Sequence, residues 1–225
     1  MNSRNLRAQN SYFTIIRQKT LCAGFFDDAC KDFYLKRLLY CQHAYQVQLH
    51  AYVLMEREIL LLFTPLAPSS FDTFIRFLNT SYNGYYFIRF ERRVQAWRNR
   101  VPICLLPNSN LVLDCQKYIE RYVLKSECCN HPGEYRYSSY CSNAFFHKPK
   151  PLQQHRAVFE FMTKKGNTLE SYREFIASPF IVEYERFLQS RLLKGRPLLS
   201  TRTGFRFEKT TALTDIKKDG TIASA

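Results

Sequence analysis

Arginines and aromatic residues are interleaved in one stretch of the chain, from Phe71 to Arg100. Six arginines stand there against two acids, Asp72 and Glu91. Guanidinium groups contact phosphates and aromatic faces stack on unpaired bases, so this mixture is typical of nucleic-acid contact. A helix with an aromatic core stripe and a solvated basic face would explain most of its first half, which favours the part from residue 89 onward. The candidate DNA contacts are Arg76, Arg89, Arg92, Arg93, Trp97, Arg98 and Arg100.

A second basic region follows near the C-terminus. Nine basic residues stand against two acids between Arg186 and Lys218. Within it, the Lys-Gly-Arg-Pro run at 194–197 is similar to a hook that inserts an arginine into a narrow minor groove. Glycine followed by proline is also an ordinary way to end a helix. Lys194 and Arg196 are the candidate contacts of this region.

Composition limits the classes of function. The chain has 225 residues, is 46% hydrophobic and carries a formal net charge of +14. Such a chain can bury a sizeable core, and its charge favours a polyanionic partner, with nucleic acid ahead of an acidic membrane surface. No run of about 18 apolar residues and no signal-peptide core occur, so we expect a cytoplasmic protein with no membrane partner.

The cysteines are possible metal ligands or disulfide partners. None of the eight cysteines forms a C-x-x-C pair, which favours reduced, mostly buried thiols over a disulfide framework. The cluster at 128–131 (Cys-Cys-Asn-His) offers two or three ligands without a second pair, which makes a poor zinc site. The residues themselves therefore predict no cofactor.

The first half of the chain alternates strands and helices. Ser11 to Arg17 is β-branched and aromatic, which predicts a strand. Asp27 and Asp28 open a predicted helix to about Tyr45. Two apolar runs, 47–54 and 59–64, predict a hairpin, and a capping sequence at 69–72 opens a second helix with apolar residues at helical spacing.

A third helix and a C-terminal extension follow. Residues 101–107 predict a strand, and Asn108 or Ser109 can cap a helix to about Leu124. The order β-α-β-β-α-β-α predicts a ferredoxin-like α+β fold, an antiparallel sheet with helices on one face. A Lys-Pro-Lys-Pro linker suggests a domain over 1–146 and a basic, mainly helical extension over 147–225, with helices near 153–165, 168–177 and 179–194.

Several segments between residues 11 and 145 occur together in a known order. They are Phe-Phe-Asp-Asp at 25–28, His-Ala-Tyr-Val-Leu-Met at 50–55, Phe-Ile-Arg at 74–76, Arg92-Arg93, Tyr-Ile-Glu at 118–120 and Tyr-Ser-Ser-Tyr at 137–140. In this order and spacing the chain resembles the REP-associated tyrosine transposases, a family of HUH-type DNA nucleotidyl transferases.

The resemblance implies a chemistry. In that family two histidines at alternate positions of one strand hold Mg²⁺ or Mn²⁺. A helical tyrosine then attacks the phosphodiester of single-stranded, hairpin-bearing DNA and forms a covalent phosphotyrosine. The family's nucleophile falls on Tyr118 in this chain. The bland alternative for Tyr118 is a core residue of its helix.

The metal ligands do not carry over. The family's histidine positions fall on Arg57 and Ile59, and Tyr122 stands where the family has asparagine. A guanidinium has no lone pair to donate and isoleucine has no donor atom, so these positions predict a lost metal site and a rate lowered by roughly 10³-fold. The substitutes that remain are Arg57 as a positive charge, or Glu56 and Glu58 in a rearranged site.

Three hypotheses follow. The chain is an active transposase, a DNA-binding descendant that no longer cuts, or an unrelated RNA-binding α+β protein. With the second hypothesis as the alternative, the residues favour a transposase-family DNA-binding protein that has DNA transposition as its inherited function and an active site weakened at the vacated ligand positions. Its partner would be single-stranded or hairpin DNA, bound by a monomer or homodimer with a steep salt dependence.

Overall fold

A four-stranded antiparallel sheet forms the centre of the protein. The computed structural model describes residues 6–19, 24–98, 101–145, 152–166 and 168–196. The strands stand in the order β2-β3-β1-β4. Each neighbouring pair is antiparallel, which confirms the predicted α+β class and the predicted order of the first seven elements. The strands are β1 (Ser11–Arg17), β2 (Val47–Leu54), β3 (Glu58–Pro65) and β4 (Ile103–Leu106).

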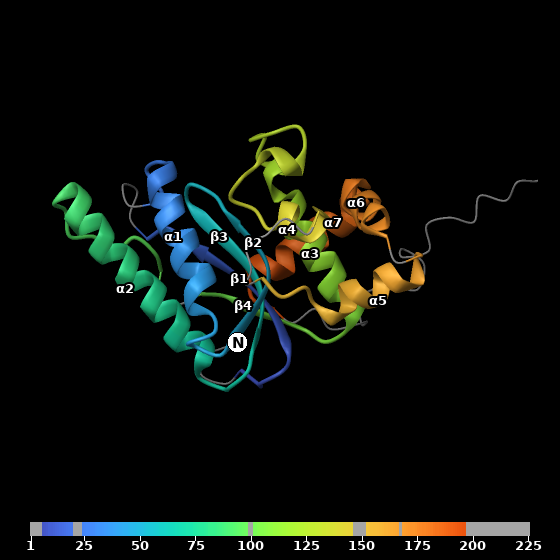
Figure 1. Ribbon diagram of the computed structural model, residues 1–225, viewed down its shortest axis with the longest axis horizontal. Helices are drawn as coiled ribbons and strands as arrows, with labels where there is room; N and C mark the ends of the chain where they lie inside the picture. The colour runs from blue at the N-terminus through green and yellow to red at the C-terminus, as the bar shows by residue number, and fades with distance from the viewer. Residues whose placement is uncertain (1–5, 20–23, 99–100, 146–151, 167, 197–225) are drawn as a thin grey trace, which may run out of the picture.

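Helices cover both faces of this sheet (Figure 1). On one face lie α1 (Asp28–Cys41) and α2 (Ser70–Phe90). On the other lies α3 (Ser109–Lys125), which packs against β2 and is covered in turn by later helices. The arrangement corrects the expectation that helices occupy one face only. The later elements are a 3-10 turn (Pro132–Glu134), α4 (Tyr140–Phe145), α5 (Arg156–Lys164), α6 (Leu169–Ala177) and α7 (Val182–Leu193).

The residues of β1 show why both faces need cover. Tyr12 and Ile16 belong to the core under α1 and α2, while Phe13 and Ile15 belong to the core under α3. All four side chains are fully buried. A strand that is apolar at consecutive positions cannot leave either face in water, so each face requires its own helical layer.

Local capping residues set the starts of two helices. Asp27 accepts the backbone N–H of Cys30 at 3.0 Å, and Asn108 accepts that of Leu111 at 3.0 Å. Each bond satisfies one of the free N–H groups in the first turn. The predicted cap of α2 is not formed, because Ser69 makes no side-chain bond to the helix. Ser70 instead donates to the carbonyl of Ala67 at 2.8 Å.

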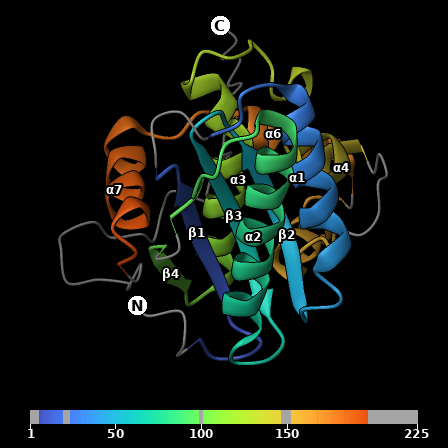
Figure 2. The same cartoon turned by 90° about the vertical axis from the view of Figure 1, so that its left-hand side faces the viewer.

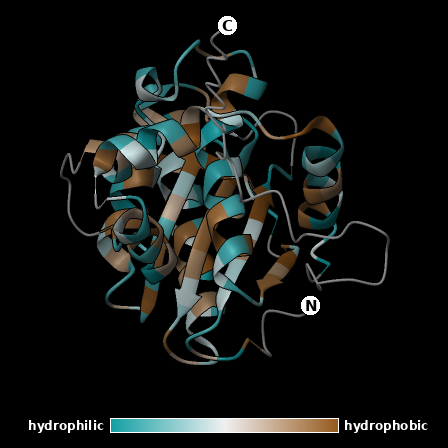
Figure 3. Ribbon diagram, turned by 90° about the vertical axis from the view of Figure 1, so that its right-hand side faces the viewer, coloured by the Kyte–Doolittle hydropathy of each residue, from teal (hydrophilic) through white to brown (hydrophobic). Residues whose placement is uncertain are grey.

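The C-terminal helices share a core with α3. Val158 of α5, Ile176 of α6 and Leu188 of α7 are fully buried in the same cluster as Phe13. Figure 3 views this side, where hydrophobic strands lie beneath the helical layers. α7 packs beside β1 and β4, along one edge of the sheet (Figure 2). The predicted boundary at 146/147 falls outside the described residues, so the division into domains remains a prediction.

No helix in the described part of the chain is both long enough and apolar enough to cross a membrane.

Candidate nucleic-acid interface

Several distant segments meet at one end of the sheet, where β1 ends and β3 begins. Arg17 pairs with Glu58 across these strands. The backbone N–H of Arg98 donates to the carbonyl of Arg17 at 3.0 Å, and that of Phe25 to the carbonyl of Glu56 at 2.9 Å. These bonds place the start of α1, the β2–β3 turn and the segment after α2 side by side.

Exposed cations gather at this end. Arg57 lies in the β2–β3 turn, Arg92 and Arg93 follow α2, and Arg98 follows them, all with exposed side chains. Glu56 and Glu91 are the exposed acids beside them. We call this surface the cationic end; it consists of Arg57, Arg92, Arg93 and Arg98.

Gly195 places the segment after α7, with exposed Lys194 and Arg196, beside the start of β4 and away from the cationic end. The carbonyl of Arg196 accepts from the thiol of Cys104, which pairs with Phe13, four residues before Arg17. The φ of Gly195 is +59°, and a Cβ there would lie 2.9 Å from the Cβ of Pro102 and from the backbone nitrogen of Ile103. The N–H of Arg196 donates to the carbonyl of Arg191 at 3.1 Å, which is the bond of a Schellman helix end. Gly195 therefore ends α7 and docks it on β4, so its glycine is explained without a groove hook. Pro197 lies outside the described residues.

Two further predicted contacts are not placed at this end. Arg76 is exposed, but it lies 13 residues before Arg89 on α2, about 20 Å along the helix axis. α2 begins at the opposite end of the sheet, after β3, so Arg76 lies away from the cationic end. Arg100 lies outside the described residues.

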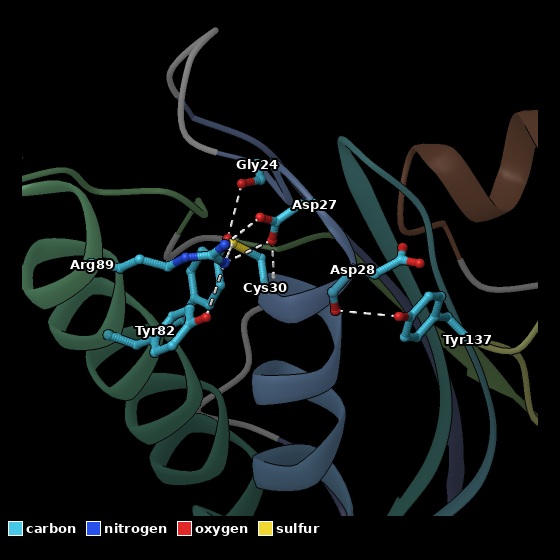
Figure 4. Close-up of polar contacts among 8 residues, drawn as sticks. Gly24, Asp27, Asp28, Cys30, Tyr82, Arg89 and Tyr137 are labelled. Atoms are coloured by element: carbon cyan, nitrogen blue, oxygen red, sulfur yellow. Dashed lines mark hydrogen bonds and ion pairs between the residues drawn. The ribbon is translucent and has the colours of Figure 1, made fainter.

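Arg89 is occupied within the protein (Figure 4). Its guanidinium donates to both carboxylate oxygens of Asp27, one at 2.7 Å, and to the hydroxyl of Tyr85 at 3.1 Å. This ion pair lowers the pKa of Asp27 to about 2. Nearby, the hydroxyl of Tyr82 donates to the carbonyl of Gly24 at 2.9 Å. Arg89 thus fastens the end of α2 to the start of α1, and we assign it a structural role.

Trp97 is also a core residue. It is fully buried, and its ring lies 4.8 Å from that of Phe25 and 5.9 Å from that of Tyr82, measured between centroids. An indole enclosed by other rings has no face free for a nucleobase. The exposed aromatic residues near the same end of α2 are instead Phe26 and Phe87.

Tyr118 lies on the α3 side of the sheet with its hydroxyl enclosed. The residue is 2% exposed, its ring packs at 6.4 Å from that of Phe13, and its hydroxyl has no hydrogen-bond partner among the described residues. Burial, and the negative charges of Glu58 and Glu185, raise the pKa of Tyr118 above its usual value. In this conformation its oxygen is shielded from a phosphodiester and remains protonated.

Ile59 and Tyr118 lie on opposite faces of the sheet, because side chains alternate along β3. Ile59 is fully buried in the core under α1 and α2, whereas Tyr118 and Leu60 belong to the core under α3. Successive side chains of a strand point to opposite faces, so positions 58 and 60 face the tyrosine. The ligand positions expected at 57 and 59 therefore do not adjoin Tyr118. A one-residue difference in strand phase moves the relevant pair to Glu58 and Leu60.

Glu58 is bonded to Tyr122 in this position. The hydroxyl of Tyr122, one turn after Tyr118 on α3, donates to the carboxylate of Glu58. Arg17 approaches the same carboxylate at 3.7 Å. Burial and Glu58 raise the pKa of Tyr122. The sequence offers Glu58 only as a substitute ligand and Tyr122 only as the residue at the family's asparagine position. The alternation of side chains along β3 is the signal that places Glu58 on the side of α3.

These residues do not fit the divalent cation that the family resemblance implies. Leu60 has no donor atom, Arg17 brings a positive charge, and the one carboxylate is already bonded to Tyr122. Across the described ranges, no three His, Cys, Asp or Glu side chains gather in a way that could hold a metal ion. His131 of the Cys-Cys-Asn-His cluster accepts the N–H of Gly133 at 3.1 Å and caps the 3-10 turn.

The protein has a mixed α+β fold in which a helix that carries a tyrosine packs on an antiparallel sheet, and solved structures with a similar fold are known. The protein is similar in structure to a REP-associated tyrosine transposase solved with a bound REP hairpin, with a TM-score of 0.53 and 11% sequence identity. The match covers 67% of this chain and 92% of the transposase chain. By sequence, no family profile and no curated protein matches. The likeness shows a shared fold.

Proposed function

We propose that this protein binds hairpin-bearing single-stranded DNA through the cationic end and does not cut it. The observation that carries the proposal is the gathering of exposed cations from the β2–β3 turn and from the segment after α2 at one end of the sheet. Each of these cations can contact a phosphate and release a counterion. The likeness to a hairpin-bound transposase supports DNA as the polyanion.

The enclosed tyrosines support binding without cleavage. Nucleophilic attack requires the oxygen of Tyr118 to reach a phosphorus atom and to lose its proton. Burial opposes both, and the bond between Tyr122 and Glu58 closes the adjoining position. Without a metal site, a developing negative charge on the phosphate would have to be stabilised by Arg17 and the surface arginines.

Fluorescence anisotropy with a labelled DNA hairpin bearing a single-stranded tail tests the binding. We expect tight binding at 50 mM salt that weakens steeply by 200 mM. The variant Arg92→Gln/Arg93→Gln/Arg98→Gln should lower the salt slope by about three, roughly one for each contact. The matched control, Lys36→Gln/Lys164→Gln/Lys165→Gln, removes three exposed cations from other surfaces and should leave the slope within one unit of the original.

The same hairpin tests the absence of cleavage. Incubation with Mg²⁺ or Mn²⁺ and separation on a denaturing gel should show no covalent adduct. An adduct that disappears in Tyr118→Phe would show that the tyrosine becomes exposed and reacts, and it would contradict binding without cleavage. Equal affinity for a hairpin of RNA and of DNA would favour the RNA-binding alternative.

A further inference from the structure

Two histidines from opposite halves of the chain, the buried His50 and the half-buried His155, are joined through two hydroxyl groups. His155 lies 2.8 Å from the oxygen of Ser11 through its Nε2 atom. Ser11 lies 3.2 Å from the hydroxyl of Thr64, and Thr64 lies 2.9 Å from Nε2 of His50. The four groups come from β1, β2, β3 and the residue before α5, so the relay joins α5 to three strands.

The two ends of the relay determine where every proton lies. Nδ1 of His155 accepts the N–H of Ala157 at 3.0 Å and caps α5, so its proton must be on Nε2. Nδ1 of His50 lies 2.7 Å from the carbonyl of Gln153 and must donate to it. A neutral imidazole carries one proton, so His155 donates to Ser11, Ser11 to Thr64, and Thr64 to His50.

One further proton cannot be accommodated. A proton on Nδ1 of His155 would face the N–H of Ala157 and remove the cap of α5. A proton on Nε2 of His50 would reverse the hydrogen bonds of Thr64 and Ser11, so that Thr64 donates to Ser11. The hydroxyl of Ser11 would then point its proton at the N–H of His155, where two donors face each other. Either way a buried donor loses its acceptor at the attachment of α5, which is costly.

We propose that this relay is an acid-sensitive latch that holds α5 on the sheet and releases it when a histidine takes up a proton. The attachment it controls is small. Ala157, Val158 and Met162 are the buried residues of α5, and the N–H of Gln153 donates to the carbonyl of Leu49 at 3.1 Å. The latch stands independently of the proposed DNA binding.

The groups around the relay make it respond below neutral pH. Burial lowers the pKa of His50 to about 4, and His155 adds to the effect. Burial also lowers the pKa of His155, against the attraction of Glu160 on α5, which is paired with Arg156. From α4, the uncharged Asn143 donates to the carbonyl of His50, and behind it lies Glu120 of α3.

Opening of α5 restores the ordinary pKa of the histidines, near 6.5. Protons then favour the open form as the pH falls from 6.5 toward 4. At pH 5 the release of His50 favours opening by about 30-fold, and the release of His155 acts in the same direction.

Hydrogen exchange of the full chain at pH 7 and pH 5, corrected for the intrinsic exchange rate, tests the latch. Protection of the α5 amides should fall by at least tenfold at pH 5, while α6, which is held through Tyr172 and Glu120, keeps its protection. His155→Asn keeps a capping oxygen that can also accept from Ser11, so acid should lower the protection of its α5 less than in the wild type. His43→Asn, at an exposed histidine, should behave as the wild type.

The proton positions provide a second readout. Imidazole ¹⁵N spectra at pH 7.5 should show the Nδ1–H tautomer for His50 and the Nε2–H tautomer for His155. The opposite tautomer at either residue would overturn the relay. Equal α5 protection at the two pH values, or an acid response in His155→Asn as large as in the wild type, would overturn the latch.

Discussion

Two groups of cations in this protein have opposite fates. The arginines of the cationic end, such as Arg92 and Arg93, are exposed. Lys117, Arg121 and Lys125 lie four residues apart on α3, a spacing that places them on one face of the helix. A helix face with this spacing of cations could contact a polyanion if it were exposed.

The α3 cations are bound to other parts of the protein. Lys117 donates to the hydroxyl of Ser178 at 2.7 Å, and Arg121 donates to the carbonyl of Ile176 at 2.7 Å. Lys125 donates to Glu185 of α7 at 3.2 Å. They hold the end of α6 and the start of α7 against α3. The contrast teaches that a basic stripe indicates a polyanion partner only where no other part of the chain satisfies its donors.

The strongest test of the α3 side is its buried carboxylate. Glu120 is fully buried and accepts from Ser139 at 3.0 Å, Asn143 at 2.7 Å and Tyr172 at 2.7 Å. Glu120→Ala leaves three buried donors without an acceptor, so we expect a loss of about 3–5 kcal/mol in the free energy of unfolding. Urea denaturation measures it.

Glu174→Ala, at an exposed glutamate of α6, is the control and should change the free energy by less than about 0.5 kcal/mol. A similarly small change in Glu120→Ala would contradict a structural role for the hydrogen bonds of Glu120 on α3.

The pH dependence of stability provides a second test of the Glu120 carboxylate. Burial raises the pKa of Glu120 from 4.5 to about 7. Between these values the folded protein binds more protons than the unfolded chain, so this contribution is full below pH 4.5 and is lost as the pH rises through 7. It amounts to roughly 3 kcal/mol across the window.

His50 acts in the opposite direction, because its lowered pKa removes stability as the pH falls from 6.5 to about 4. We therefore expect Glu120→Gln to make unfolding free energy, measured from pH 4 to 8, rise more steeply with pH than in the wild type. An unchanged profile would show that Glu120 does not titrate in this range.

A reciprocal pair of substitutions tests the two cation groups directly. Lys117 lies 4.7 Å from the ring centre of Phe175 and 4.9 Å from that of Phe180, and burial lowers its pKa to about 8. Lys117→Ala should lower the free energy of unfolding by about 2 kcal/mol and leave DNA affinity within about twofold. Arg93→Ala should weaken DNA binding and leave stability within about 0.5 kcal/mol. Thermal unfolding and anisotropy on both variants decide it, and a loss of DNA affinity in Lys117→Ala would merge the two groups.

The smallest expected effect separates the two tyrosines of α3. Tyr122→Phe removes a bond to Glu58 and should cost about 1 kcal/mol. Tyr118→Phe removes a buried hydroxyl that has no partner, so it should be neutral or slightly stabilising. Differential scanning calorimetry compares the melting temperatures. A larger loss for Tyr118→Phe would show that its hydroxyl is bonded in solution.

Local patterns predicted the elements well. Ser11 to Arg17 is a strand over the predicted residues, and the helix after Asn108 begins with the predicted cap. The long apolar run of β3 could have indicated cover on both faces, because a strand with one wet face alternates with polar residues. The expected helix from Asp28 ends at Cys41, four residues earlier than predicted.

The candidate site divides along the same line. The basic character of residues 92–98 can be predicted from the sequence, because it depends only on which residues are arginine and not on contacts with distant parts of the chain. That Arg89 is captured by Asp27, and that Trp97 is enclosed by Phe25 and Tyr82, depends on contacts between residues far apart in the chain. Periodicity contains no information about such pairs.

The sequence by itself determined the order and type of the elements and the positive charge, because both depend on neighbouring residues and on composition. Only the tertiary structure decided which face of β3 meets Tyr118, which cations remain free, and that His50 and His155 join one relay. Strand phase, burial and proton positions all depend on which distant segments are brought together. A one-residue change in that pairing reverses every side chain of a strand.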